Sequence, residues 1–313
     1  MAVSKKVPQR LYKYRAFNNL TLDLLVVDHT FFADPSTFND PLDTQPHLEV
    51  DIENVDLKEV LSKMVSERER SEMNAAAHAI NYSGPKTVNH ISKLSRRSAA
   101  RVISEIEYFA TDIEHAAEEQ ERLKQLLRSS IEVELRRRYN KGVLSLAERP
   151  NCPLMWSHYG DQHKGICIGY SVPPEDVDNL IKVDYRGGRR VKVSDIAAML
   201  SGDKSARQIV DRAVLARKAP EWKYEREWRL IGDRGLSNSA LELEEVIFGL
   251  KCESPMQYVV IKALERRRPK VRFYEICETR GSFSLKKRPL DMGEMLAHYP
   301  RRYRDILDEF TPV

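Results

Sequence analysis

The sequence predicts an α+β protein, with a mixed, mostly antiparallel sheet core and a large helical insertion. Aromatic and β-branched segments of strand length occur at both ends of the chain, and the long stretch between them has apolar residues at helical spacing. A chain of 313 residues can bury a sizeable core. We therefore expect a discontinuous α+β core domain at residues 1–53 and 141–313, with the insertion at 54–140.

The first elements follow from local patterns. The alternating, aromatic segment Leu11–Arg15 predicts a strand, and Asn18 offers an N-cap for a short helix that runs through Leu25. Residues 29–33 predict a second short strand. The next ten residues contain two prolines and read as a turn-rich loop.

The insertion is predicted to be helical because Leu57, Val60, Leu61 and Met64 recur at helical spacing, as do apolar residues within 103–113 and 123–131. Ser83, Gly84 and Pro85 predict a break that separates the first helix of the insertion from the second. We expect a protruding helical subdomain that can be shortened without unfolding the sheet.

Strand patterns return after Gly142. They predict strands at 143–146, 164–170, 181–185, 227–231, 243–248, 271–276 and 283–287, and helices at 194–200, 205–218 and 255–266.

Composition is that of an ordinary globular protein, with 42% hydrophobic and 31% charged residues. A net charge of +4 does not by itself indicate nucleic-acid binding. The N-terminal segment lacks the apolar region of a signal peptide, and no apolar run approaches the roughly 20 residues that cross a bilayer. The four cysteines are scattered and read as reduced core residues. We therefore expect a cytoplasmic protein without a membrane association.

Two carboxylates, Glu225 and Glu227, stand two residues apart before an aliphatic run. In a strand they would point to one face, with Tyr224 and Trp228 on the other. Like charges on one face repel, so such pairs occur mainly where the charge does chemistry or meets a cation. An edge strand with its glutamates in water is the alternative.

A segment around His158 is dense in aromatic and polar residues. Trp156 and Tyr159 beside this histidine suit stacking on a planar ring, although a helix packed under the sheet explains the aromatic residues equally well. The two-histidine spacing of zinc proteases is absent, and His163 would not share a helix face with His158.

Lys13 and Arg15 share a strand face with Leu11, which is unusual for two cations and suggests an anion-binding face. Asn39 and Asp40 read as an Asx-Pro turn. The glycine-rich dinucleotide fingerprint, the P-loop and the nucleophile elbow of α/β-hydrolases are all absent from the sequence, which disfavours those enzyme classes.

Together these motifs resemble a bacterial family known as domain of unknown function 2971. The resemblance spans about residues 10 to 280 and rests on Leu11–Arg15, Phe38–Pro41, Met155–Gly165 and Tyr224–Arg229. The family name implies no activity, and residues 54–140 lie outside its motifs.

The order of a basic first strand, a short helix, a short strand and a late Glu-x-Glu is similar to ADP-ribosyltransferases of the toxin or phage-defence type. That similarity implies NAD as substrate, held by Arg15 or Lys13, with Ser36 shaping the pocket. It implies that Glu227 stabilises the sugar cation formed when nicotinamide leaves, while Glu225 positions the acceptor. The chain lacks a clean Ser-Thr-Ser triplet. The remaining candidates are His158 as a catalytic residue and Tyr14, Asn39, Trp156 and Tyr159 as cofactor-binding residues.

We expect Arg15, Asn39, Trp156, His158 and Glu227 to line one pocket.

A metal-dependent nuclease or phosphodiesterase built from Asp40, Asp43, His158 and the two glutamates is an alternative, with Arg96–Arg97, Arg136–Arg138, Arg189–Arg190 and Arg266–Arg268 steering nucleic acid. A non-enzymatic sensor or interaction protein is another. The sequence leaves open the acceptor, whether protein or nucleic acid, and the oligomeric state.

Overall fold

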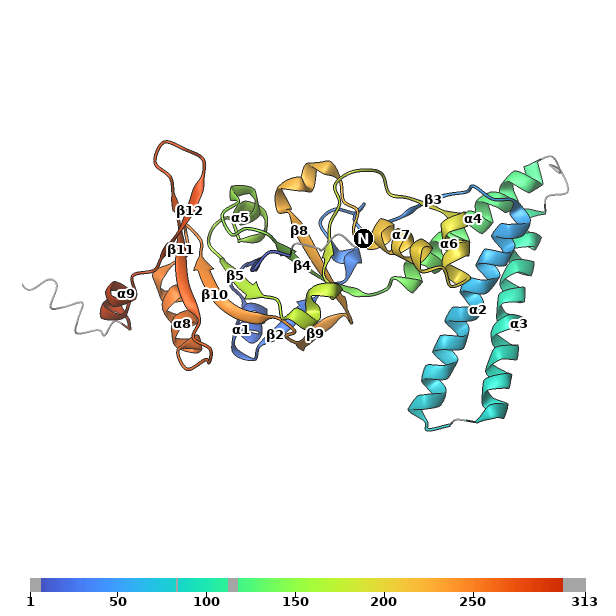
Figure 1. Ribbon diagram of the computed structural model, residues 1–313, viewed down its shortest axis with the longest axis horizontal. Helices are drawn as coiled ribbons and strands as arrows, with labels where there is room; N and C mark the ends of the chain where they lie inside the picture. Colours follow the sequence, from blue (N-terminus) through green and yellow to red (C-terminus); the bar gives the residue numbers. More distant parts are fainter. Residues whose placement is uncertain (1–6, 83, 112–117, 301–313) are drawn as a thin grey trace, which may run out of the picture. The chain divides into compact units, whose positions relative to one another are not determined.

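The fold is α+β, as the sequence predicts. A computed structural model describes residues 7–82, 84–111 and 118–300 of the chain (Figure 1). It divides into two compact units, each considered separately below. The sheet unit comprises Met1–Thr37, Lys141–Val183 and Pro220–Val313, and the helical unit comprises Phe38–Asn140 and Asp184–Ala219.

These units do not follow the expected domain boundaries. Residues 38–53 and 184–219, which the sequence assigned to the core domain, belong to the helical unit. The two segments are joined by long-range pairing, because β3 (His47–Glu49) pairs in parallel with β7 (Arg190–Lys192). Whether 54–140 behaves as an independent insertion stays a prediction.

The sheet unit is built on eight strands in the order β12-β11-β10-β5-β1-β4-β8-β6. Of its seven neighbouring pairs only β10 and β11 run parallel, which makes the sheet mixed and mostly antiparallel. The strands are β1 (Leu11–Arg15), β4 (Gly142–Ala147), β5 (Ile166–Ser171), β6 (Ile181–Lys182), β8 (Glu227–Gly232), β10 (Glu242–Phe248), β11 (Arg272–Glu278) and β12 (Leu285–Pro289).

Short elements complete this unit. As predicted, the Asn18 side chain caps the first helix by accepting a hydrogen bond from the Thr21 amide at 2.9 Å. The sequence predicted β2 but missed its partner β9. The elements are α1 (Asn19–Val26), β2 (His29–Phe32), β9 (Gly235–Asn238), α5 (Pro153–Tyr159), α8 (Ser254–Leu264), α9 (Met292–His298), and the 3-10 turns η1 (Pro35–Thr37), η3 (Pro174–Asn179) and η4 (Pro220–Glu225).

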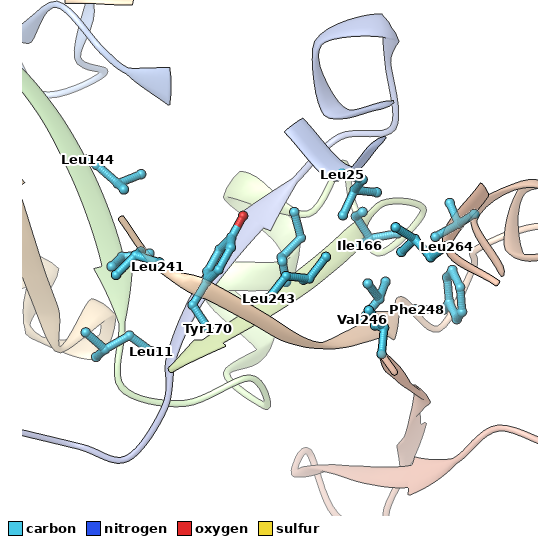
Figure 2. Close-up of a cluster of buried hydrophobic side chains, with 14 of the residues drawn as sticks. Leu11, Leu25, Leu144, Ile166, Tyr170, Leu241, Leu243, Val246, Phe248 and Leu264 are labelled. Atoms are coloured by element: carbon cyan, nitrogen blue, oxygen red, sulfur yellow. The ribbon is translucent and has the colours of Figure 1, made fainter. Parts of the chain in front are cut away.

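Each face of the eight-stranded sheet carries its own apolar core. We call one the α8 face, where Leu11, Ile166 and Trp228 pack with Leu264 of α8. Figure 2 shows part of this core, in which strand residues such as Leu243 and Ile166 belong to one cluster with the helical residues Leu25 and Leu264. The other is the α5 face, where Tyr12, Cys167 and Ala147 pack with Trp156 of α5. Two covered faces explain why central strands such as β5 are buried along nearly their whole length.

The helical unit contains long helices α2 (Asn54–Ala79), α3 (Pro85–Ala110) and α4 (Glu119–Arg138), together with α6 (Val193–Leu200) and α7 (Lys204–Leu215). The buried residues of α2 lie in its first half, from Leu57 to Val65, and those of α3 are spread from Ile91 to Ala110. In the described ranges of the chain, no helix has the length and apolar character needed to cross a membrane.

Shortening the α2–α3 pair should therefore be tolerated. No described residue from 74 to 88 is buried, so replacing this segment with a four-residue Gly/Ser linker removes little apolar burial. We expect the free energy of unfolding, measured by urea denaturation, to fall by less than about 1 kcal/mol. Leu61→Ala, at a fully buried position, is the control and should cost about 2–5 kcal/mol. A shortened chain as unstable as this control would contradict the prediction.

Candidate functional site

Arg15 and Glu227 lie on opposite faces of the sheet, so the expectation that they share a pocket is wrong. Arg15 pairs with Ile166, which belongs to the α8 face, whereas Glu227 pairs with Ala147, which belongs to the α5 face. Directly paired residues in antiparallel strands point to the same side. The two side chains are therefore separated by the sheet itself.

Lys13 and Arg15 do share a strand face, as predicted, but it is the α8 face. The Lys13 ammonium donates a hydrogen bond to the Ser145 carbonyl at 2.8 Å and so links two neighbouring strands. The Arg15 Nε is buried without a hydrogen-bond partner, and this burial lowers the pKa of the guanidinium. Neither cation can bind a phosphate of a ligand that is held on the α5 face.

Trp156 and Tyr14 form the core of the α5 face and do not bind a ligand ring, which corrects their expected cofactor role. Trp156 is 0% exposed, its ring meets that of Tyr14 edge-on at 5.1 Å, and its indole N–H donates to the Pro150 carbonyl. The Tyr14 hydroxyl donates to the Arg149 carbonyl at 2.8 Å. Both side chains fix the segment that leads into α5.

The two carboxylates are not related by strand alternation. Glu225 ends the turn η4, Glu227 begins β8, and Arg226 between them has a left-handed backbone with φ of 46°. For a residue with a Cβ this conformation costs about 1–2 kcal/mol. The predicted grouping of Tyr224 with Trp228 is accordingly wrong, because Tyr224 packs on the α5 face and Trp228 on the α8 face. Strain of this kind is concentrated at functional sites.

Both carboxylates are buried, with residue exposures of 4% for Glu225 and 3% for Glu227, and each accepts hydrogen bonds from a different side chain. Arg229, which is fully buried, grips Glu227 with two hydrogen bonds, from Nε at 2.8 Å and from Nη2 at 3.0 Å. Glu225 accepts a hydrogen bond from the Tyr159 hydroxyl at 2.8 Å. The Glu227 charge is thus neutralised within the strand by a two-point guanidinium contact.

Three rings cluster beside Glu225. His158 stacks on Tyr224 with ring centroids 6.2 Å apart and meets Trp222 at 6.4 Å. Trp222 and Tyr224 are themselves 6.0 Å apart. His158 is exposed and the other two rings are half-buried, so the cluster reaches solvent. Sequence reasoning missed Trp222, although its place two residues before Tyr224, in an aromatic segment leading to the glutamates, was a usable signal.

Ser36 and Asn39 are not brought to this cluster by any contact within the sheet unit. Ser36 is exposed in η1, where its amide donates to Asp34 at 2.8 Å. Asn39 is exposed and belongs to the helical unit. Their expected roles in cofactor binding remain predictions.

A strained turn holds α5 in place. Asp161, Gln162 and His163 are consecutive left-handed residues with φ of 51°, 52° and 72°. The His163 amide donates to the Trp156 carbonyl at 3.2 Å, and its carbonyl accepts from the Lys251 amide at 2.9 Å. Its ring stacks on Trp156 with 17° between planes. The turn therefore ties the end of α5 to the residues after β10.

The partly buried His163 should make stability depend on pH. Burial, reinforced by the nearby Lys251 charge, lowers the pKa of His163 below its ordinary value of 6.5. In this pH range His163 binds a proton in the unfolded chain but not in the folded chain. The free energy of unfolding should therefore fall as the pH drops from about 6.5 towards the lowered pKa. His163→Gln should flatten this slope in urea denaturation measured between about pH 7 and 5. An unchanged slope in the variant would contradict the assignment.

The residues proposed for a metal site are engaged otherwise. Asp43, in the helical unit, forms a buried ion pair with Lys218 at 3.4 Å, and Asp40 closes an Asx turn onto the Leu42 amide at 2.9 Å. Within residues 7–82, 84–111 and 118–300, no group of three or more His, Cys, Asp or Glu side chains is placed to hold a metal ion. The geometry therefore adds nothing to the metal-dependent alternative.

Comparison with known proteins finds one similarity. Residues 155–230 match the family described as "Protein of unknown function (DUF2971)". The matched segment contains α5 from its third residue onward with the following turn, and η4 with both glutamates and Arg229. It does not reach the motifs at Leu11–Arg15 and Phe38–Pro41. No curated protein and no solved structure matches the chain.

Proposed function

We propose that the sheet unit binds a nucleotide with a flat ring and cleaves its glycosidic bond, with NAD as the substrate and Glu225 as the reactive carboxylate. One observation carries the proposal. The buried Glu225 accepts a hydrogen bond from the Tyr159 hydroxyl, and it is the next residue in the chain after Tyr224, whose ring belongs to the cluster that reaches solvent. A flat ring stacked on that cluster would place the attached sugar near the carboxylate.

The chemistry follows from charge. When the bond between the sugar C1′ and the nicotinamide nitrogen breaks, both electrons leave with nicotinamide and the sugar becomes an oxocarbenium cation. A carboxylate in a site of low dielectric stabilises that cation far more than it does in water. Water or another acceptor then attacks C1′ and gives up a proton, for which the exposed His158 imidazole is the nearest candidate base in the ring cluster.

We assign the reactive role to Glu225 because its Tyr159 partner adjoins the ring cluster at His158, whereas the ADP-ribosyltransferase similarity implies that role for Glu227. A carboxylate bound at both oxygens by a buried arginine has its charge already compensated, so it adds less stabilisation to a developing cation. We assign Glu227 the structural role of holding Arg229 and the start of β8. The phosphates of the nucleotide would require cations other than Lys13 and Arg15.

The test is direct. Purified chain is incubated with NAD, and released nicotinamide is quantified by chromatography together with the loss of NAD. The proposal expects the two quantities to match, with and without a chelator, and expects NAD affinity to fall in Trp222→Ala. A chain that neither binds NAD nor releases nicotinamide would overturn it. If the NAD carries a label in its ADP-ribosyl part, transfer of that group to a protein or nucleic-acid acceptor would appear as a labelled acceptor.

A further inference from the structure

The positive charge of the chain is concentrated in one short segment of the sheet unit. Residues 262–289 hold ten lysines and arginines against three glutamates, a net charge of +7 in a chain whose total is +4. This segment comprises the end of α8, the following loop and the hairpin of β11 and β12 (Figure 1). The rest of the chain is therefore net negative, so the segment is a distinct basic region.

Many cations of the segment are available to a partner. Arg272 and Lys287 are held by Glu244 and Glu245 at 2.8 Å, and Arg267 by Asp28 at 2.9 Å. Another five cations are exposed, and no carboxylate in the described part of the chain forms an ion pair with them. They are Arg266, Arg268, Lys270, Arg280 and Lys286.

The hairpin tip adds an aromatic ring. Phe283 is 100% exposed, more than any other large apolar residue in the described ranges. The turn that carries it is ordered by hydrogen bonds from the Thr279 amide to the Ser284 carbonyl and from the Ser282 amide to the Thr279 carbonyl. Gly281 takes the left-handed conformation that this turn needs, with φ of 74°. A tight turn thus holds the ring in water between Arg280 and Lys286.

We propose that this hairpin is a binding site for single-stranded nucleic acid. An exposed ring offers a stacking platform for an unpaired base, Arg280 and Lys286 flank that ring in the sequence, and the exposed cations before β11 can bind phosphates further along the strand. The bases of a duplex are already stacked and would not reach the ring. An anionic membrane fits less well, because Gly281, Ser282 and Ser284 leave one apolar side chain at the tip.

The test uses fluorescence anisotropy with labelled single-stranded DNA and RNA, the same sequences as duplexes, and vesicles of anionic lipid. We expect the single strands to bind most tightly and the affinity to fall with salt. Phe283→Ala should weaken binding by about tenfold or more while keeping the salt dependence, since stacking of one base is worth roughly that factor. The double variant R280E/K286E should lower both the affinity and the slope of its salt dependence.

Matched controls come from helix α3 of the helical unit. Phe109→Ala removes another exposed phenylalanine, and K93E/R97E reverses two exposed cations; both should bind as the parent does. The proposal would be overturned if Phe283→Ala bound as the parent does, or if the control variants lost as much affinity. It would also be overturned if the chain preferred vesicles or duplex, or did not bind single strands at low salt. It does not rest on the proposed NAD chemistry, so Glu225→Gln should bind the strands normally.

Discussion

Glu225→Gln should lower nicotinamide release by about 10²–10³-fold, the loss seen when one transition-state contact is removed. Glutamine keeps the shape and can still accept a hydrogen bond from the Tyr159 hydroxyl, so the change removes the negative charge and retains this contact. Affinity for NAD should change far less, because the charge matters mainly once the sugar becomes cationic. Initial rates and calorimetric binding, measured on the same preparation, separate the two effects.

Glu221→Gln is the matched control, since Glu221 is an exposed glutamate in the same turn, η4. It should release nicotinamide at the parental rate. If Glu225→Gln keeps parental turnover, or if it loses NAD binding and turnover to the same extent, Glu225 does not act on the developing charge.

Replacing one partner of the Glu227–Arg229 pair should destabilise the sheet unit by about 3–5 kcal/mol, because the other charge stays buried and loses this two-point contact. The two side chains have exposures of 4% and 0%. We expect this loss in the free energy of unfolding for both Glu227→Gln and Arg229→Met. The double variant E227Q/R229M should lose much less than the sum of the two, which a double-mutant cycle in urea measures as coupling.

This cycle also decides between the two roles of Glu227. A Glu227→Gln chain that is as stable as the parent but releases no nicotinamide would restore the catalytic role that the family similarity implies. A destabilised chain with near-parental turnover per folded molecule supports the structural role.

The sequence predicted the elements well where periodicity was sufficient. The first strand, the Asn18 cap and the helices of 54–140 follow from spacing of apolar residues and from capping chemistry. It did not predict the pairing between β3 and β7, because this pairing joins residues about 140 positions apart and neither three-residue strand has a local signature.

The site was harder to predict because it depends on register between strands. The shared face of Lys13, Arg15 and Leu11 followed from alternation alone. The face of Glu227 relative to them depends on how β8 pairs with β4 and β4 with β1, which one strand's pattern does not contain. The left-handed backbone of Arg226 then interrupts the alternation of side-chain directions between the two glutamates. Arginine seldom adopts this conformation, so the sequence does not predict it.

Aromatic residues gave the least reliable site assignments. Trp156 and Trp222 have equivalent stacking chemistry, and only packing shows that the first is core and the second reaches solvent. Trp228 is also buried, against the α8 face. These differences make the tryptophans useful probes of the proposed site.

The most direct test of the account is therefore ligand binding seen at its three tryptophans. The chain is labelled with 5-fluorotryptophan, each fluorine resonance is assigned by a single Trp→Phe replacement, and NAD is titrated in. The account predicts a saturable shift of the Trp222 resonance, with those of buried Trp156 and Trp228 nearly unchanged. The same titration with Glu225→Gln should shift Trp222 equally. A titration that leaves Trp222 unmoved, or that moves only the buried tryptophans, would contradict a nucleotide site at the ring cluster.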